Sequence, residues 1–276
     1  MEFRITTLSE NTASWGLVGE WGLSMLVEAD GLRVLMDCGF SFSAAYNART
    51  LGVDLASLDR IVLSHGHADH TGGLDVVLKS TGRREVVGHP DIWEKKYART
   101  QDGGERYVGM PSVREGLEAL GAGFVLTREP VRLSDRVMTT GEIPVTVDYE
   151  GIEPELYVRR GAESMPDRLA DDLALVIDAD FGLVVVLGCA HRGIVNTLHH
   201  ALRLTGGESI YAVVGGAHLF RASEERLERT VADLREMGIQ KLALCHCTGF
   251  KALSRLAQEF GDGSLQNNAG TRIVLP

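Results

Sequence analysis

Short apolar runs separated by turn residues mark the first third of the chain. Residues 23–29 and 32–36 are two such runs on either side of Asp30-Gly31, which predicts a β-hairpin. The pattern further predicts helices over 43–51 and 72–80, and strands over 59–64 and 85–88. Strands are also expected over 143–149 and 173–178, whereas residues 91–130 give no clear pattern.

The last third alternates more regularly between strands and helices. Strands are predicted over 183–187, 210–214 and 242–245, and helices over 193–204 and 223–237. In the second helix, Leu227, Val231 and Leu234 form an apolar stripe. Ser223 is expected to cap its start and Gly238 its end. Hairpins, mixed strands and covering helices together predict an α/β (α+β) protein in which helices lie outside the sheets.

Four of the predicted strands lead into a histidine. The strand over 59–64 precedes His65, and those over 183–187, 210–214 and 242–245 precede His191, His218 and His246. Strand ends in α/β sheets commonly gather at one edge, where ligands bind. These imidazoles are therefore candidates for one shared site.

The densest chemical signal is His65-Gly66-His67-Ala68-Asp69-His70, in which four of six residues can bind a metal. An extended backbone would point His65 and His67 the same way, whereas Asp69 and His70 would turn elsewhere. One loop could thus serve two neighbouring cations, which can share a hydroxide between them. A solvated polar turn is the simpler interpretation of one histidine, but not of three with an aspartate.

Further metal ligands have to come from other strands. His246 is the strongest candidate, followed by His191 and then His218, and a satisfied core histidine is the alternative for each. Cys189 is either an additional or bridging ligand or a packed thiol. Cys245 and Cys247 alternate with His246 and are expected to face away from it as packing residues.

Composition and charge limit the partners and the location that we expect for the protein. The 276-residue chain has a net charge of −10, so we expect no nucleic-acid partner. No apolar run is long enough for a membrane span, and the start does not resemble a secretory signal. The four cysteines show no disulfide framework, which favours a reducing, cytoplasmic location. We expect residues 1–276 to form a single domain with a small-molecule substrate.

The stretch from Leu63 to Leu74 resembles the H-x-H-x-D-H signature of the metallo-β-lactamase superfamily. Further matches, in chain order, lie at 20–24, 37–39, 187–196, 215–219 and 245–249. Together they resemble the subfamily of 7,8-dihydropterin-6-methyl-4-(β-D-ribofuranosyl)aminobenzene 5′-phosphate synthase-like hydrolases. The resemblance implies a four-layer αβ/βα sandwich with a site for two metals at one edge of two packed sheets.

The resemblance also implies roles for individual residues. It assigns metal ligation to His65, His67, Asp69, His70 and His246, and makes Asp37 a support for the ligands. Zinc, as two ions, is the expected metal, with Mn²⁺ or Fe²⁺ as alternatives.

The chain departs from the family where the late strand ends in Cys189 instead of aspartate, and where no histidine lies between His89 and His191. His191 is therefore the expected substitute ligand, with His218 the competing choice. Trp21 stands where the subfamily tends to carry histidine.

These features favour a metal-dependent hydrolase in which a metal-bound hydroxide attacks a small phosphorylated or ester-type substrate. Asp69 would orient the hydroxide and accept its proton, and His218 would donate to the leaving group or a phosphate. The alternative is a β-ribofuranosylaminobenzene 5′-phosphate synthase-like transferase of pterin cofactor assembly, which joins aminobenzoate to phosphoribosyl pyrophosphate. A non-catalytic metal-binding sensor is a third interpretation, and a thiol enzyme using Cys189 and His191 is the weakest.

Overall fold

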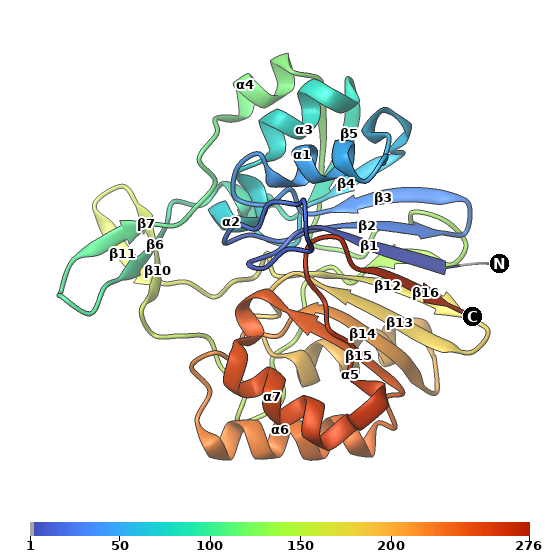
Figure 1. Ribbon diagram of the computed structural model, residues 1–276. Helices are drawn as coiled ribbons and strands as arrows, with labels where there is room; N and C mark the ends of the chain where they lie inside the picture. The colour runs from blue at the N-terminus through green and yellow to red at the C-terminus, as the bar shows by residue number, and fades with distance from the viewer. Residues whose placement is uncertain (1–2) are drawn as a thin grey trace.

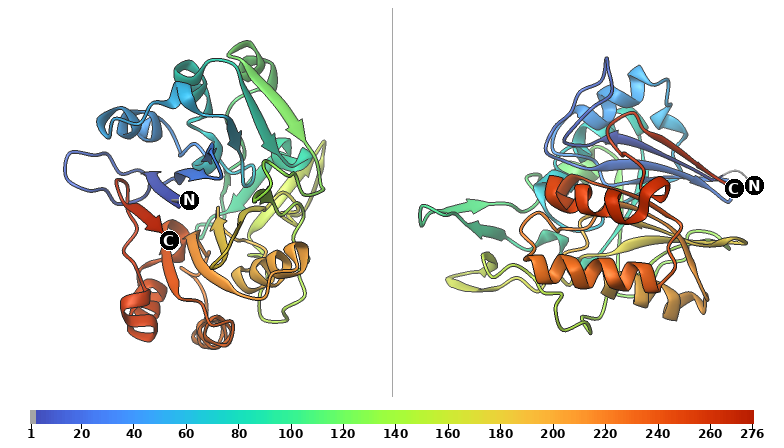
Figure 2. Two further views of the ribbon diagram at one scale, coloured as in Figure 1. Left: turned by 90° about the vertical axis from the view of Figure 1, so that its right-hand side faces the viewer. Right: turned by 60° about the horizontal axis from the view of Figure 1, so that its bottom comes forward.

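Two β-sheets face each other across a shared core, and helices cover the outer face of each sheet (Figure 1). The computed structural model of the protein describes residues 3–276. The described chain begins and ends on neighbouring antiparallel strands, and both termini lie at the side opposite a projecting group of strands (Figure 2). The predicted four-layer αβ/βα sandwich is confirmed.

The first sheet has seven strands. In spatial order they are β16 (Arg272–Leu275), β1 (Phe3–Ser9), β2 (Ser24–Ala29), β3 (Leu32–Met36), β4 (Arg60–Val62), β5 (Arg84–Gly88) and β8 (Ala122–Leu126). Its outer face packs against α1 (Ser43–Thr50), α3 (Leu74–Thr81) and α4 (Arg114–Ala119). The short helices η1 (Leu55–Ser57), α2 (Ala68–Thr71) and η2 (Pro90–Trp93) lie in its connections.

The second sheet has five strands. They are β15 (Lys241–Cys245), β14 (Ile210–Gly216), β13 (Gly182–Leu187), β12 (Ala174–Ala179) and β9 (Val137–Thr139). Its outer face is covered by α5 (Ile194–Thr205), α6 (Glu224–Glu236) and α7 (Phe250–Phe260). The turns η3 (His246–Thr248) and η4 (Gly261–Gly263) lie on either side of α7.

Four more strands form an arm that projects from the sandwich (Figure 1). They are β11 (Glu163–Pro166), β10 (Leu156–Arg160), β6 (Lys96–Arg99) and β7 (Glu105–Tyr107). Two of these strands, β6 and β7, come from the stretch 91–130, where the sequence shows no clear pattern. The strands of the arm are short and mostly exposed on at least one face, so they carry little apolar periodicity.

The run Leu183–Leu187 shows why strands of the second sheet can be apolar at every position. Val184 and Val186 enter the core between the sheets, whereas Leu183, Val185 and Leu187 pack beneath the helices. Both faces of β13 are therefore buried, so every position favours an apolar side chain. Full burial of each such side chain contributes about 2 kcal/mol to folding.

Most predicted elements are present, with one clear error. The hairpin over 23–36, the helices and the strands that lead into histidines are confirmed. Ser223 accepts from the Arg226 amide at the start of α6, and Gly238 takes a positive φ after its end, as predicted. The predicted strand over 143–149 is wrong. Pro144 lacks an amide donor, and the amides of Thr146 and Val147 donate to Asn196 instead of to a neighbouring strand.

No helix among residues 3–276 combines the length and the apolar character needed to cross a bilayer.

Candidate metal centre

The sheet topology gathers the histidine-bearing loops at one edge. Strands β13, β14 and β15 run parallel and neighbour one another, so their carboxyl ends lie together. The loops after these strands carry His191, His218 and His246. In the facing sheet, β4 ends just before His65. The histidines therefore gather between the two sheets, and each sheet contributes candidate ligands.

The loop after β4 presents two imidazoles side by side. The ring centroids of His65 and His67 lie 4.6 Å apart, as expected for alternate residues of an extended segment. The chain then turns into α2, which carries Asp69 and His70. Glycine is required between the two histidines because a Cβ at Gly66 would lie 2.4 Å from the Ile92 carbonyl oxygen.

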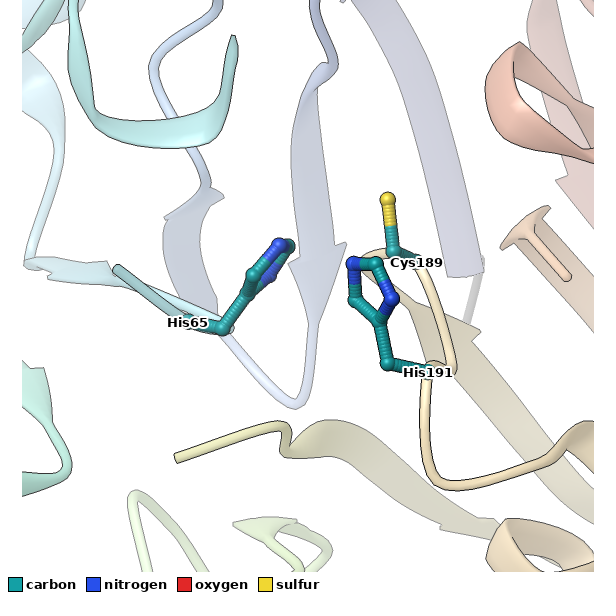
Figure 3. A group of neighbouring side chains, drawn as sticks. All are labelled: His65, Cys189 and His191. Carbon is teal, nitrogen blue, oxygen red and sulfur yellow. The ribbon is translucent and has the colours of Figure 1, made fainter. Parts of the chain in front are cut away.

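Cys189 and His191 approach this loop from the facing sheet (Figure 3). The ring of His191 lies 4.9 Å from those of both His65 and His67. Donor atoms of His65, Cys189 and His191 fall within 4.8 Å of one another. His191 thus lies beside the first two histidines, close enough to bind the same ion.

Cys189 also contacts a second group of donors. His70 Nε2 lies 3.0 Å from the Cys189 sulfur. Donor atoms of His70, Cys189 and His246 again lie within 4.8 Å of one another, and His246 Nε2 is 3.3 Å from Asp69 Oδ2. Cys189 therefore stands between two ligand groups, at the place where a bridging ligand would lie.

Asp37 orients His70 from behind. Its Oδ2 atom lies 2.6 Å from His70 Nδ1, and the Ser64 amide and hydroxyl donate to the same carboxylate. In the neutral ring, a proton on Nδ1 leaves Nε2 free to bind an ion in the site. Burial lowers the pKa of His70, but the Asp37 carboxylate raises it to about 9. Asp37 thus lies where the resemblance expected a supporting residue.

His218 pairs with an acidic residue that the sequence analysis missed. Glu153 Oε1 lies 3.0 Å from His218 Nε2, and Glu153 Oε2 lies 3.7 Å from His191 Nδ1. Burial opposes the shift, yet contacts with Cys247 and Glu153 raise the pKa of His218 to about 10. Glu153 lies in a loop before β10, and no sequence signal distinguished it from other surface acids.

Cys247 was predicted to face away from His246 as a packing residue, but the structure places it in the site. Its sulfur accepts from the His218 amide at 3.3 Å, and its donor atom lies within 4.8 Å of those of Cys189 and His218. The extended alternation ends at Cys245 because His246 adopts a φ of +54° and begins the turn η3. Cys245 does point into the core between the sheets.

The donor set fits a metal ion. The Nε2 atoms of His65 and His67 and both ring nitrogens of His191 are buried, yet find no hydrogen-bond partner among residues 3–276. Such atoms cost free energy unless something binds them. Burial and neighbouring imidazoles lower the pKa values of His65 and His67 well below the ordinary value, which keeps both rings neutral. Neutral imidazole, carboxylate and thiolate groups match the ligand chemistry of zinc.

The site opens into a cavity of about 790 Å³. Trp21 and Phe220 form apolar walls beside the metal-ligand candidates, while Arg99 and Arg106 come from the arm. Trp21 also donates from Nε1 to Asp69 Oδ2 at 3.1 Å. The sequence did not reveal Arg99 and Arg106 as cavity residues, because only the folded arm brings them to the histidines.

Comparisons with known proteins agree with this geometry. A family model described as the metallo-beta-lactamase superfamily matches residues 22–201. The chain is 34% identical to 7,8-dihydropterin-6-methyl-4-(beta-D-ribofuranosyl)-aminobenzene-5′-phosphate synthase of Methanocaldococcus jannaschii, over 98% of this chain and 96% of the relative.

Two solved structures also resemble this chain in fold. Tm1679, described as a metal-dependent hydrolase of the beta-lactamase superfamily, is 30% identical, with a TM-score of 0.85 over 98% of both chains. Zn²⁺-bound PqqB from Methylobacterium extorquens is 10% identical, with a TM-score of 0.59 over 99% of this chain and 100% of PqqB, and shows likeness of fold alone.

Proposed function

Since this chain belongs to the metallo-β-lactamase superfamily, we propose that it is a metal-dependent hydrolase of small phosphorylated or ester-type substrates. The observation that carries the proposal is the convergence of buried, unpartnered imidazole nitrogens from both sheets, within residues 3–276, at the mouth of a cavity. Unpaired donors at this density are costly in a folded protein and are retained where a ligand satisfies them.

Two metal positions are proposed. His65, His67 and His191 would hold one ion and Asp69, His70 and His246 the other, with Cys189 between them. Zinc suits these imidazole, carboxylate and thiolate donors, and Mn²⁺ or Fe²⁺ are the alternatives. A divalent cation in such a site lowers the pKa of water and polarises a carbonyl or phosphoryl group.

The protein's own groups would orient the reactants and move protons. Contacts with His70 and His246 outweigh burial and lower the pKa of Asp69, so this carboxylate is ionised and accepts hydrogen bonds, as from Trp21. We propose that it orients the attacking water and receives its proton. His218, held in its charged form by Glu153, would donate a proton from Nδ1 to the leaving group.

The cavity supports an anionic substrate. Arg99, Arg106 and Arg221 line it together with His67, His191 and His218. Guanidinium groups bind phosphate and carboxylate through charge-assisted hydrogen bonds. The aromatic walls formed by Trp21 and Phe220 would contact an apolar part of the same molecule.

Metal removal tests the proposal. The purified protein is assayed with phosphomonoesters, phosphodiesters and a lactone before chelation, after it, and after Zn²⁺ is restored. We expect turnover that disappears with the metal and returns with zinc, and that is lost in Asp69→Ala. His199→Ala, which removes an imidazole outside the cluster, is the matched control and should retain activity. Full activity in protein shown to be metal-free contradicts the proposal.

The near-full-length identity with the archaeal synthase supports a second candidate, a transferase that joins an aminobenzoate to phosphoribosyl pyrophosphate. The same arginines would then hold the pyrophosphate. Incubation of the metal-loaded protein with both substrates, monitored for pyrophosphate release, separates this activity from hydrolysis. A protein that binds metal and a small ligand yet turns over none of these substrates would instead support the sensor interpretation.

A further inference from the structure

A lysine is buried beside the metal-ligand candidates without contacting them. Lys96, the first residue of β6, is only 1% exposed. Its Nζ atom lies 2.9 Å from Asp167 Oδ2 and 2.9 Å from Asp171 Oδ1. A buried ammonium is tolerated only when anionic partners compensate for lost hydration. Burial lowers its pKa, but the two carboxylates more than offset this and keep Lys96 charged.

The two aspartates differ in their second contacts. Asp171 uses its other oxygen, Oδ2, to accept from the Gly66 amide at 2.8 Å. Asp167 instead accepts from the Leu169 amide, within its own loop. Only Asp171 therefore connects the lysine to the backbone between His65 and His67.

The same loop is held from its other side by the base of the arm. The Ala68 amide donates to the Val108 carbonyl oxygen, and the Val108 amide donates to the Lys96 carbonyl oxygen. Backbone and side chain of Lys96 thus contribute to two routes from the arm to the histidine loop. Hydrogen bonds at Gly66 and at Ala68 therefore hold the backbone on both sides of His67.

We propose that Asp171 is a positioning residue for the metal centre: held by Lys96, its carboxylate fixes the Gly66 amide and so sets His65 and His67 in their ligand orientation. The inference rests on the proposed function in one respect, namely that this loop binds metal. Groups that orient metal ligands through hydrogen bonds typically raise metal affinity by about 10- to 100-fold. Asp171 differs from the usual case because it orients two ligands through the backbone between them.

Asp171→Asn and Asp167→Asn form a matched pair for the test. Each substitution replaces one of the two carboxylates that contact Lys96. Only Asp171→Asn weakens the bond to Gly66, because the new amide group must turn its carbonyl oxygen toward Lys96 and so presents its NH2 group to the Gly66 amide. Zinc affinity is measured by competition with a chromophoric chelator. Hydrogen exchange of the Gly66 amide is measured in the metal-free protein, independently of zinc.

We expect Asp171→Asn to weaken zinc binding by about 10- to 100-fold and to speed exchange at Gly66. Asp167→Asn should lower the melting temperature while leaving both quantities within about threefold of the wild type, because Asp167 makes no hydrogen bond to Gly66 and the bond from the Gly66 amide to Asp171 remains. Equal zinc affinity and equal Gly66 exchange in all three proteins overturn the proposal. If Asp171→Asn does not fold, Lys96→Met replaces it, and wild-type affinity and exchange in that variant also overturn it.

The two proposals fail in different ways. A wild-type protein that binds no zinc, manganese or iron overturns the proposed function and this inference together. A wild-type protein that binds zinc, with no change in Asp171→Asn, overturns only the role of Asp171.

Discussion

The Nδ1 atom of His70 lies 2.6 Å from Oδ2 of Asp37, and both side chains are fully buried. The contact fixes the ring so that its Nε2 atom faces Cys189 and the other donors. Asp37 itself has a φ of +61°, a backbone conformation that a non-glycine residue adopts at some cost. A strained backbone that aims a carboxylate at a histidine indicates that the orientation of His70 matters to the site.

Replacing Asp37 with Asn should weaken zinc binding by about tenfold or more, because Asn has a single acceptor oxygen, for which the Ser64 amide and His70 Nδ1 then compete, and carries no charge to hold the tautomer of His70. The metal-free protein should also lose about 3 kcal/mol of stability, since one partner of a buried pair is removed. Competition titration at pH 8.5 and urea unfolding measure the two effects. Unchanged affinity together with lowered stability would assign Asp37 to folding alone.

Replacing Trp21 with Phe tests whether zinc binds near Asp69. The change removes the Nε1 donor 3.1 Å from Asp69 Oδ2 and keeps an aromatic wall. Zinc binding near Asp69 should alter the fluorescence of Trp21 in the wild type and leave the emission of Trp21→Phe nearly constant. Trp15 is fully exposed and Trp93 packs against Phe124, so neither contacts the site. An equal response of both proteins to zinc would place the ion away from Asp69.

The sequence predicted the part of the site that depends on local spacing. His65, His67, Asp69 and His70 lie in one loop, so their proximity needs no knowledge of distant contacts. His191 and His246 could be found because the carboxyl ends of buried parallel strands meet at one edge of the sheet, and both residues lie just beyond such ends. In each case a strong apolar strand signalled the position.

The remaining residues depend on tertiary packing. Glu153 reaches His218 only because the connection between the arm and the second sheet folds back over the site. Cys247 was misassigned because strand alternation was extended across His246, where the backbone turns. Arg99 and Arg106 lie on short strands of the arm. The base of the arm is held by the ion pairs of the buried Lys96, and not by a pattern of apolar residues that the sequence would reveal. Isolated charged residues on short strands carry no signal that distinguishes a binding surface from a solvated one.

Removing the positive charge of Arg106 should weaken the binding of phosphorylated substrates. Arg106 lines the cavity from strand β7 of the arm and is not among the candidate metal ligands. In Arg106→Met we expect KM for a phosphorylated substrate to rise about tenfold while kcat changes little, because a contact remote from the reacting atoms contributes equally to ground and transition states. Arg203→Met, on the exposed side of α5, is the control. A fall in kcat at constant KM would instead place Arg106 near the reacting group.

Asp172 provides a prediction about pH. Its Oδ2 accepts from the Arg192 amide at 2.9 Å, but its Oδ1 is buried with no hydrogen-bond partner among the residues that the structure describes. Burial raises the pKa of Asp172 from the ordinary 3.8 to about 6. The folded state therefore holds the proton more tightly than the unfolded chain, and ionisation of Asp172 destabilises the fold as pH rises above about 4. The full cost, reached above pH 6, is about 3 kcal/mol.

In Asp172→Asn this cost is absent. The variant, studied without metal in the presence of a chelator, should be more stable than the wild type at pH 8 by up to about 3 kcal/mol, and the difference should vanish near pH 4. Urea unfolding at pH 4, 6 and 8 measures it, with Asp180→Asn as the control for loss of an exposed carboxylate. A difference that does not change with pH would mean that Asp172 keeps the same charge throughout. If metal addition then removes the extra stability of the variant at pH 8, the positive charge of the ion offsets the cost of the buried Asp172 carboxylate in the wild type. This is the expected behaviour of a buried acid beside a cationic centre.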